Sequence, residues 1–106
     1  MNIKLRKAAL SNLYVGSIVS IGESFFGSKP GTVGVIYGIN DGAALVINSN
    51  GQFGAFTESC LDLFMVTVVG FANTLCSYQC KNTEQLIADF KNNLFGPAFT
   101  AGQQIL

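Results

Sequence analysis

The sequence has no histidine and no tryptophan, and charged residues make up only 11% of its 106 residues. Without histidine the chain lacks Ser-His-Asp and Cys-His catalytic groups and the commonest general base in enzymes. An average soluble domain carries about 25% charged residues. We therefore expect no catalytic residues of these kinds, and the interpretation leans away from an enzyme.

The cations are both few and unevenly placed. Lys4, Arg6 and Lys7 stand within the first seven residues, and Lys29 is the only cation between residues 8 and 80. A nucleic-acid-binding domain neutralises phosphates with a stripe of basic residues. The net charge of zero and the lack of a stripe argue against nucleic-acid binding, although the N-terminal cluster could contact an anion.

Two long runs, residues 42–57 and 63–80, carry no charge at all. The second run is long enough to approach the lower limit for a membrane-spanning helix, but Thr67, Asn73 and Gln79 interrupt it with polar groups. Residues 4–21 resemble a signal peptide only loosely, because polar residues break their apolar region. We expect no membrane span, a retained N-terminus and a cytoplasmic protein.

Three cysteines are present, at positions 60, 76 and 80. An odd number of cysteines in a chain long enough to fold without disulfides predicts free thiols in a reducing compartment. A closed zinc site needs four ligands, usually Cys or His, and this chain offers three cysteines and no histidine. We expect neither a metal ion nor another cofactor.

Short β-like runs separated by glycine and asparagine fill the chain up to residue 80. In residues 32–39, apolar side chains recur at every second position, which is typical of a strand. Asp41-Gly42 and Asn50-Gly51 are hairpin signals because both pairs tolerate positive φ. The predicted strands are residues 17–21, 32–39, 43–48, 52–56, 64–71 and 75–80, with one helical turn at 57–61.

The two ends of the chain are less regular. Residues 2–13 fit either a strand at 2–6 or a short helix at 4–13. Residues 83–95 predict a helix, with Asn82 or Thr83 as its cap and an apolar stripe at helical spacing. The stripe is Leu86, Ile87, Phe90 and Leu94. Gly96-Pro97 is expected to end this helix, and residues 98–106 are expected to form a short, extended apolar tail.

The order from residue 16 to residue 66 is strand, long loop, strand, turn, strand, hairpin, strand, helical turn, strand. Val15–Ile21, Pro30–Ile36 and Asn50–Phe53 carry this spacing. The spacing resembles the SH3-like small β-barrel superfamily. The resemblance covers residues 16–66 and implies an antiparallel barrel of five or six strands. Together with the helix at 83–95, it leads us to expect a mainly β, α+β fold that forms one domain over residues 1–106.

In SH3-like barrels, ligands often meet the surface between the long first loop and the short hairpins. Carried over by position, this surface would hold six residues: Glu23, Phe25, Phe26, Tyr37, Asp41 and Phe53. Their rings could form a binding patch, as in the aromatic cages that hold cations, or could pack in the core. The lack of tryptophan argues against binding of polyproline peptides.

These observations favour a non-catalytic binding or interaction module that associates with copies of itself as a dimer or tetramer. We expect self-association because residues 64–71 are apolar on both faces of the predicted strand. Together the two uncharged runs exceed what one small core can hide, and a large exposed apolar patch usually marks an interface. A protein or a small molecule is the other partner that we consider.

The alternative is a small oligomeric enzyme or ligand-binding subunit with a pocket between chains. Convergence of Glu23, Asp41 or Glu58 on such a pocket would favour it. Glu58 and Asp62 lie four residues apart, and we expect them to form a solvated pair. As flanking carboxylates, they are expected to raise the pKa of Cys60.

Overall fold

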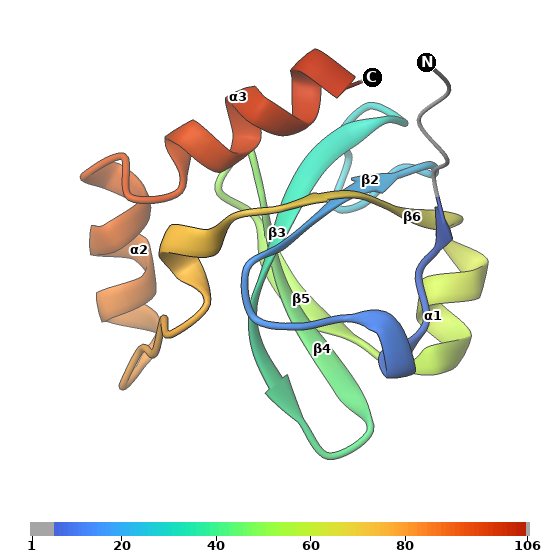
Figure 1. The fold of residues 1–106 in the computed structure, drawn as a ribbon, viewed down its shortest axis with the longest axis horizontal. Helices are drawn as coiled ribbons and strands as arrows, with labels where there is room; N and C mark the ends of the chain where they lie inside the picture. Colours follow the sequence, from blue (N-terminus) through green and yellow to red (C-terminus); the bar gives the residue numbers. More distant parts are fainter. Residues whose placement is uncertain (1–5, 106) are drawn as a thin grey trace.

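The computed structural model describes residues 6–105 of the chain (Figure 1). Its elements, in chain order, are β1 (Arg6–Lys7), η1 (Leu10–Asn12), β2 (Ser17–Ile21), β3 (Thr32–Asn40), β4 (Ala43–Asn48), β5 (Phe53–Phe56), α1 (Glu58–Leu63), β6 (Val66–Phe71), η2 (Asn73–Leu75), α2 (Thr83–Lys91) and α3 (Gly96–Ile105). The predicted mainly β, α+β class is confirmed.

The six strands form one antiparallel sheet in the order β1-β6-β2-β3-β4-β5. Five of the predicted strands are present, and the two hairpin turns are as expected, with φ of 77° at Gly42 and 85° at Gly51. The sheet is curved but not closed into the predicted barrel (Figure 1). One edge is β1, which pairs with β6, and the other edge is β5, which α1 follows in the chain.

Adjacent residues of the central strands enter two different cores. Val19 of β2 and Ile36 of β3 lie in a first core inside the curve of the sheet. Their neighbours Ile18 and Val35 lie in a second core on the outer face. Because successive side chains of a strand point to opposite faces, both faces of this sheet must be covered.

The first core is closed by α1 and by a group of phenylalanines. Leu61 of α1 is buried in it. The ring centroids of Phe25 and Phe56 lie 4.8 Å apart, edge to face, and those of Phe56 and Phe64 lie 5.2 Å apart, stacked. Thr57 caps α1, since its hydroxyl accepts a hydrogen bond from the Cys60 N–H.

The second core is covered by η2, α2 and α3 (Figure 1). The cap at Asn82 is confirmed, because its side chain accepts from the Gln85 N–H. The predicted apolar stripe is only partly buried: Leu86 is enclosed and Phe90 half-buried, whereas Ile87 and Leu94 are exposed. Phe95, just beyond the end of α2, is fully buried in the second core.

Two expectations for the C-terminal third were wrong. Residues 98–106 were expected to be extended, but α3 runs from Gly96 to Ile105, because proline is favoured in the first turn of a helix. Residues 75–80 were expected to form a strand, but η2 and a turn replace it. There, Leu75 enters the second core, and the Tyr78 N–H donates to the Leu75 carbonyl.

The N-terminal ambiguity is resolved in part. Arg6–Lys7 forms β1, and Leu10–Asn12 forms one 3-10 turn, whose Asn12 carboxamide accepts from the Ala9 N–H. The strand predicted at 2–6 otherwise lies outside the described residues. None of the helices found between residues 6 and 105 combines the length and apolar character that a bilayer crossing requires.

Helix α3 approaches the sheet closely at Gly102. A Cβ added there would lie 2.7 Å from methyl carbons of both Ile18 and Val33. Gly34 plays the same role inside the sheet, where a Cβ would lie 2.9 Å from a Val46 methyl. Both methyls at Gly102 belong to β-branched side chains, which rotate little to make room.

We expect Gly102→Ala to lower the free energy of unfolding by about 1–3 kcal/mol, the usual effect of overpacking. In a helix free of contacts the same change would raise stability by about 1 kcal/mol. Urea denaturation measures both the sign and the size. The neighbouring, exposed Ala101 is the control, since Ala101→Gly should cost only the helix-propensity difference. A stabilised Gly102→Ala variant would show that α3 does not rest on β2 and β3.

Candidate functional site

Strand β5 is one edge of the sheet, and its outer side is unpaired within residues 6–105. The Asn48 N–H donates to the Gln52 carbonyl over 2.8 Å. Since hydrogen-bonded pairs alternate along an antiparallel ladder, Gly54 and Phe56 direct their backbone groups to β4. Phe53 and Ala55 therefore direct their N–H and C=O groups outward, and no described residue bonds to them.

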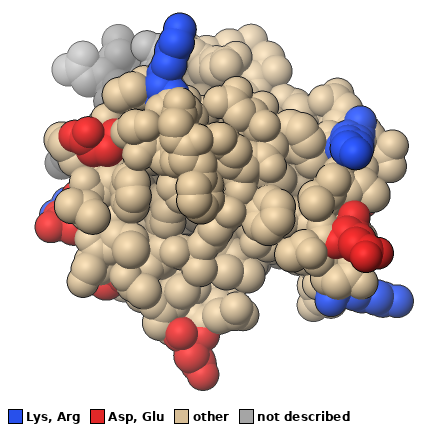
Figure 2. Space-filling model, turned by 180° about the vertical axis from the view of Figure 1, so that it is seen from behind, with Lys and Arg blue, Asp and Glu red and all other residues tan. Residues whose placement is uncertain are grey.

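Strand β5 and its neighbour β4 carry no charged residue. Strands β4 and β5 and their turn fall within the uncharged residues 42–57. Figure 2 shows the molecule from behind, with charged side chains around the outline of this face and none across its middle. Natural edge strands are usually protected by lysine, proline or a bulge, and β5 has none of these.

The other edge of the sheet is different. Within the described residues, strand β1 comprises Arg6 and Lys7, and both are exposed cations. Charged side chains on an edge strand are a common protection against pairing with another chain. The contrast between the two edges makes β5 the candidate for interaction.

The long loop between β2 and β3 brings an exposed phenylalanine to the inner side of β5. Phe26 is 65% exposed, and its ring centroid lies 4.5 Å from that of Phe25. Its carbonyl accepts from the Gln52 side-chain amide over 2.7 Å. A Cβ added at Gly54 would lie 3.6 Å from the Phe26 ring, so Phe26 borders the edge strand.

Phe26 also has a strained backbone, with φ of 51°. Left-handed conformations cost a non-glycine residue about 1–2 kcal/mol, and strain of this kind often persists at functional positions. Met65, with the same φ of 51°, is a second exposed apolar residue of this type. We call β5 together with Phe26 the β5 surface.

The structure separates the six residues predicted for the ligand surface. Phe25 is buried in the first core, and Tyr37 and Phe53 pack in or against the second core. Glu23 is exposed in the same loop as Phe26, and its N–H donates to the Phe64 carbonyl. Asp41 is exposed at the β3–β4 turn. Only Phe26 and the backbone of Phe53 contribute to the β5 surface.

Of the carboxylates considered for catalysis, Glu58 and Asp62 each contact the N-terminal segment, whereas Glu23 and Asp41 lie in other loops. Glu58 accepts a hydrogen bond from the Leu10 N–H over 2.8 Å, and Asp62 forms an ion pair with Lys7. Both carboxylates are exposed, as expected for a solvated pair, and in addition they hold the N-terminal segment against α1. Within residues 6–105, no group of three or more acidic or cysteine side chains gathers where it could hold a metal ion.

The Cys60 thiol differs from expectation in its electrostatics. The Thr57 hydroxyl donates a hydrogen bond to Cys60 Sγ over 3.3 Å and thereby lowers the pKa of the thiol. The expected rise in pKa from flanking carboxylates was therefore wrong. Cys60, Cys76 and Cys80 all carry free thiols.

Two tyrosines of the second core have raised pKa values. Burial is the main cause for both, and for Tyr78 the hydrogen bond that its hydroxyl donates to Asp89 over 2.7 Å adds to the effect. A phenol that donates to a carboxylate holds its proton firmly. Tyr78 thus fastens the segment after η2 to helix α2 and stays neutral at physiological pH.

Sequence reasoning named Phe26 and Phe53 but missed β5 as a free edge, because an edge is a property of strand order. The uncharged run 42–57 was its only signal in the sequence. Comparisons of the chain with protein-family models, with curated proteins and with solved structures gave no match. The site must therefore be interpreted from its own chemistry.

The strain at Phe26 predicts a reversed order of two substitutions. Phe26→Gly should be more stable than Phe26→Ala by about 1 kcal/mol, because both remove the ring and only glycine relieves the positive φ. At exposed Leu63, within helix α1, the order should be the usual one, with alanine more stable than glycine. Thermal and urea denaturation of the four variants decides this. Equal stability of the two Phe26 variants would mean that position 26 is unstrained.

Proposed function

We propose that the protein is a non-catalytic interaction module that associates with a second copy of itself through β5. The free backbone groups of Phe53 and Ala55 are the observation that carries this proposal. Its three free thiols are in keeping with a reducing compartment, and we propose a cytoplasmic location on that ground.

The proposed pairing is antiparallel and two-fold, with the axis beside Gly54. Phe53 of each copy then lies opposite Ala55 of the other, and these pairs exchange four backbone hydrogen bonds. Gly54 of one copy faces Gly54 of the other as a pair without hydrogen bonds, in which Cα atoms approach to about 4.5 Å. Glycine suits this close approach because it has no side chain.

The lack of charge favours a second copy of the chain, rather than an unrelated strand, as the partner of β5. A two-fold interface brings each residue near its own equivalent, so any charge would face its like. Residues 42–57 carry none, and the uncharged face is therefore compatible with itself. Phe26, exposed on the same surface, adds apolar area that pairing would bury.

The sequence pointed to a different surface for self-association. Residues 64–71 were expected to leave one apolar face for another chain. Instead, Val66 enters the first core and Val69 the second, and α3 covers the outer face. Met65 and Phe71 remain exposed at the two ends of the strand.

We also propose that the fold is SH3-like. Strands β2 to β6 follow the order β6-β2-β3-β4-β5, with the long loop after β2 and the single helical turn of α1 before β6. In that superfamily the long loop borders the ligand surface, and here it carries Phe26. The alternative function, a ligand-binding or enzymatic subunit with a pocket between chains, would need such a pocket to form at this same pairing.

Ala55→Lys tests the pairing, since Ala55 is exposed and its side chain has no role in either core. The parent should show twice its 11.3 kDa mass by light scattering coupled to size exclusion. The two introduced lysines would be diagonal neighbours about 7–8 Å apart across the axis. Their repulsion should shift the equilibrium to monomer, with a dissociation constant raised about tenfold or more.

Two controls make the test specific. Ala101→Lys makes the same change at an exposed position of α3 and should leave the dimer intact. Mixing Ala55→Lys with Ala55→Glu should restore a dimer, because opposite charges then meet across the axis. A parent that stays at 11.3 kDa across a wide dilution series would refute the self-association. A dimer indifferent to both Ala55 variants would place the interface elsewhere.

A further inference from the structure

A groove of about 770 Å³ lies between β6 and the segment from β1 to β2. Its walls come from β6, from Arg6 of β1 and from the segment that leads into β2. Its lining includes Tyr14, Val15, Val69 and Phe71. Tyr14 and Phe71 are 64% and 48% exposed, so two aromatic rings border the opening.

Two neutral polar side chains of the groove, those of Ser17 and Asn12, already have partners. The Ser17 hydroxyl accepts from the Tyr14 N–H over 2.9 Å. The Asn12 carboxamide accepts from the Ala9 N–H and donates to the Lys7 carbonyl over 3.0 Å. These groups shape the wall and offer little to a ligand.

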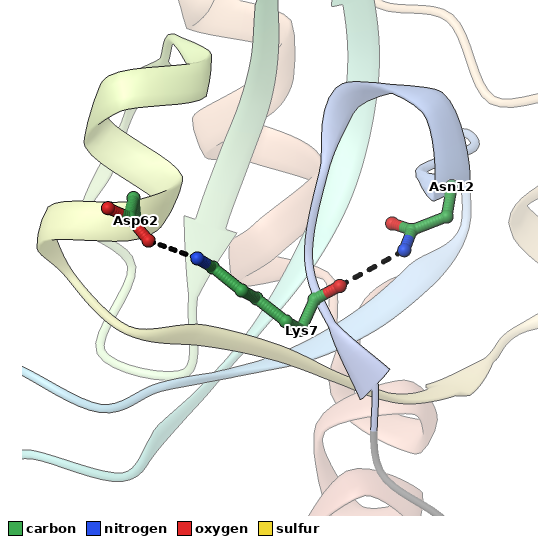
Figure 3. Close-up of polar contacts among 3 residues, drawn as sticks. All are labelled: Lys7, Asn12 and Asp62. Carbon is green, nitrogen blue, oxygen red and sulfur yellow. Dashed lines mark hydrogen bonds and ion pairs between the residues drawn. The ribbon is translucent and has the colours of Figure 1, made fainter.

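Arg6 is the only charged residue among the described residues that line the groove. Lys7, the next residue, faces the other way and forms its ion pair with Asp62 of α1 (Figure 3). Glu58, the other nearby acid, accepts from Leu10. Among residues 6–105 no carboxylate pairs with Arg6.

We propose that this groove binds a small amphiphilic carboxylate, with the carboxylate on Arg6 and the apolar body between Tyr14 and Phe71. A guanidinium holds a carboxylate with two parallel N–H···O bonds. The volume falls within the range of small-molecule sites, which are mostly apolar with a few polar groups that fix orientation. This binding is independent of the pairing through β5.

Cys76 provides a native probe of occupancy. It is exposed and lines the groove, whereas Cys60 lies outside it on α1. A ligand in the groove should therefore shield the thiol of Cys76 from an alkylating reagent and leave that of Cys60 unchanged.

Decanoate is the test ligand, and decanol, of equal chain length without charge, is its control. Calorimetric titration of the whole chain should show saturable binding of decanoate, at least about tenfold tighter than that of decanol. In parallel, mass spectrometry should show that decanoate slows iodoacetamide labelling of Cys76 but not of Cys60. Equal binding of the two ligands would overturn the role of Arg6, and no saturable binding would overturn the site.

Variants separate the contributions of charge and shape. Arg6→Gln should weaken decanoate binding about tenfold and leave decanol unchanged. Tyr14→Ser should weaken both ligands. Lys29→Gln, which removes an exposed cation outside the groove, should change neither. Loss of decanoate binding in Lys29→Gln to the same degree as in Arg6→Gln would mean that net charge, and not the groove, attracts the anion. Light scattering on the same samples reports self-association separately.

Discussion

The fold depends on one constraint, which is that the central strands are apolar on both faces. Ile18 and Val19 in β2, and Val35 and Ile36 in β3, are adjacent residues that are all buried. A sheet with one solvated face would alternate apolar with polar residues. This sheet needs a cover on each side, and the chain supplies α1 with the phenylalanine group for one and α2 with α3 for the other.

This constraint also explains the shortage of charge and its distribution. Strands buried on both faces have little room for charged side chains, so these gather on helices, turns and the N-terminal segment. The Lys7–Asp62 pair and the Glu58–Leu10 bond hold that segment against α1. Arg6 is thereby left beside the groove, and β5 is left as an uncharged edge. Both proposed sites thus follow from the small number of charged residues and their uneven distribution.

The sequence predicts local elements well and their spatial relations poorly. Strands 17–21 and 43–48 are confirmed residue by residue, since period-two patterns and turn glycines define them. Helix α3 was missed because Gly96-Pro97 was interpreted only as a helix end. The buried spacing of Ala98, Phe99 and Gly102 was the overlooked signal. Tyr37 and Phe25 share a predicted surface but enter different cores, because no pattern along one strand shows which neighbours cover it.

Native-state hydrogen exchange tests most directly whether α3 is part of the core. The amide of Phe99, which donates to the Phe95 carbonyl, reports on α3, and those of Val35 and Ile36 report on the central sheet. If one cooperative unit covers both faces, the three amides should share an opening free energy, within about 1 kcal/mol of that for global unfolding. A Phe99 amide that opens several kcal/mol more easily than Val35 and Ile36 would contradict the account, because the sheet would then stand without its outer cover.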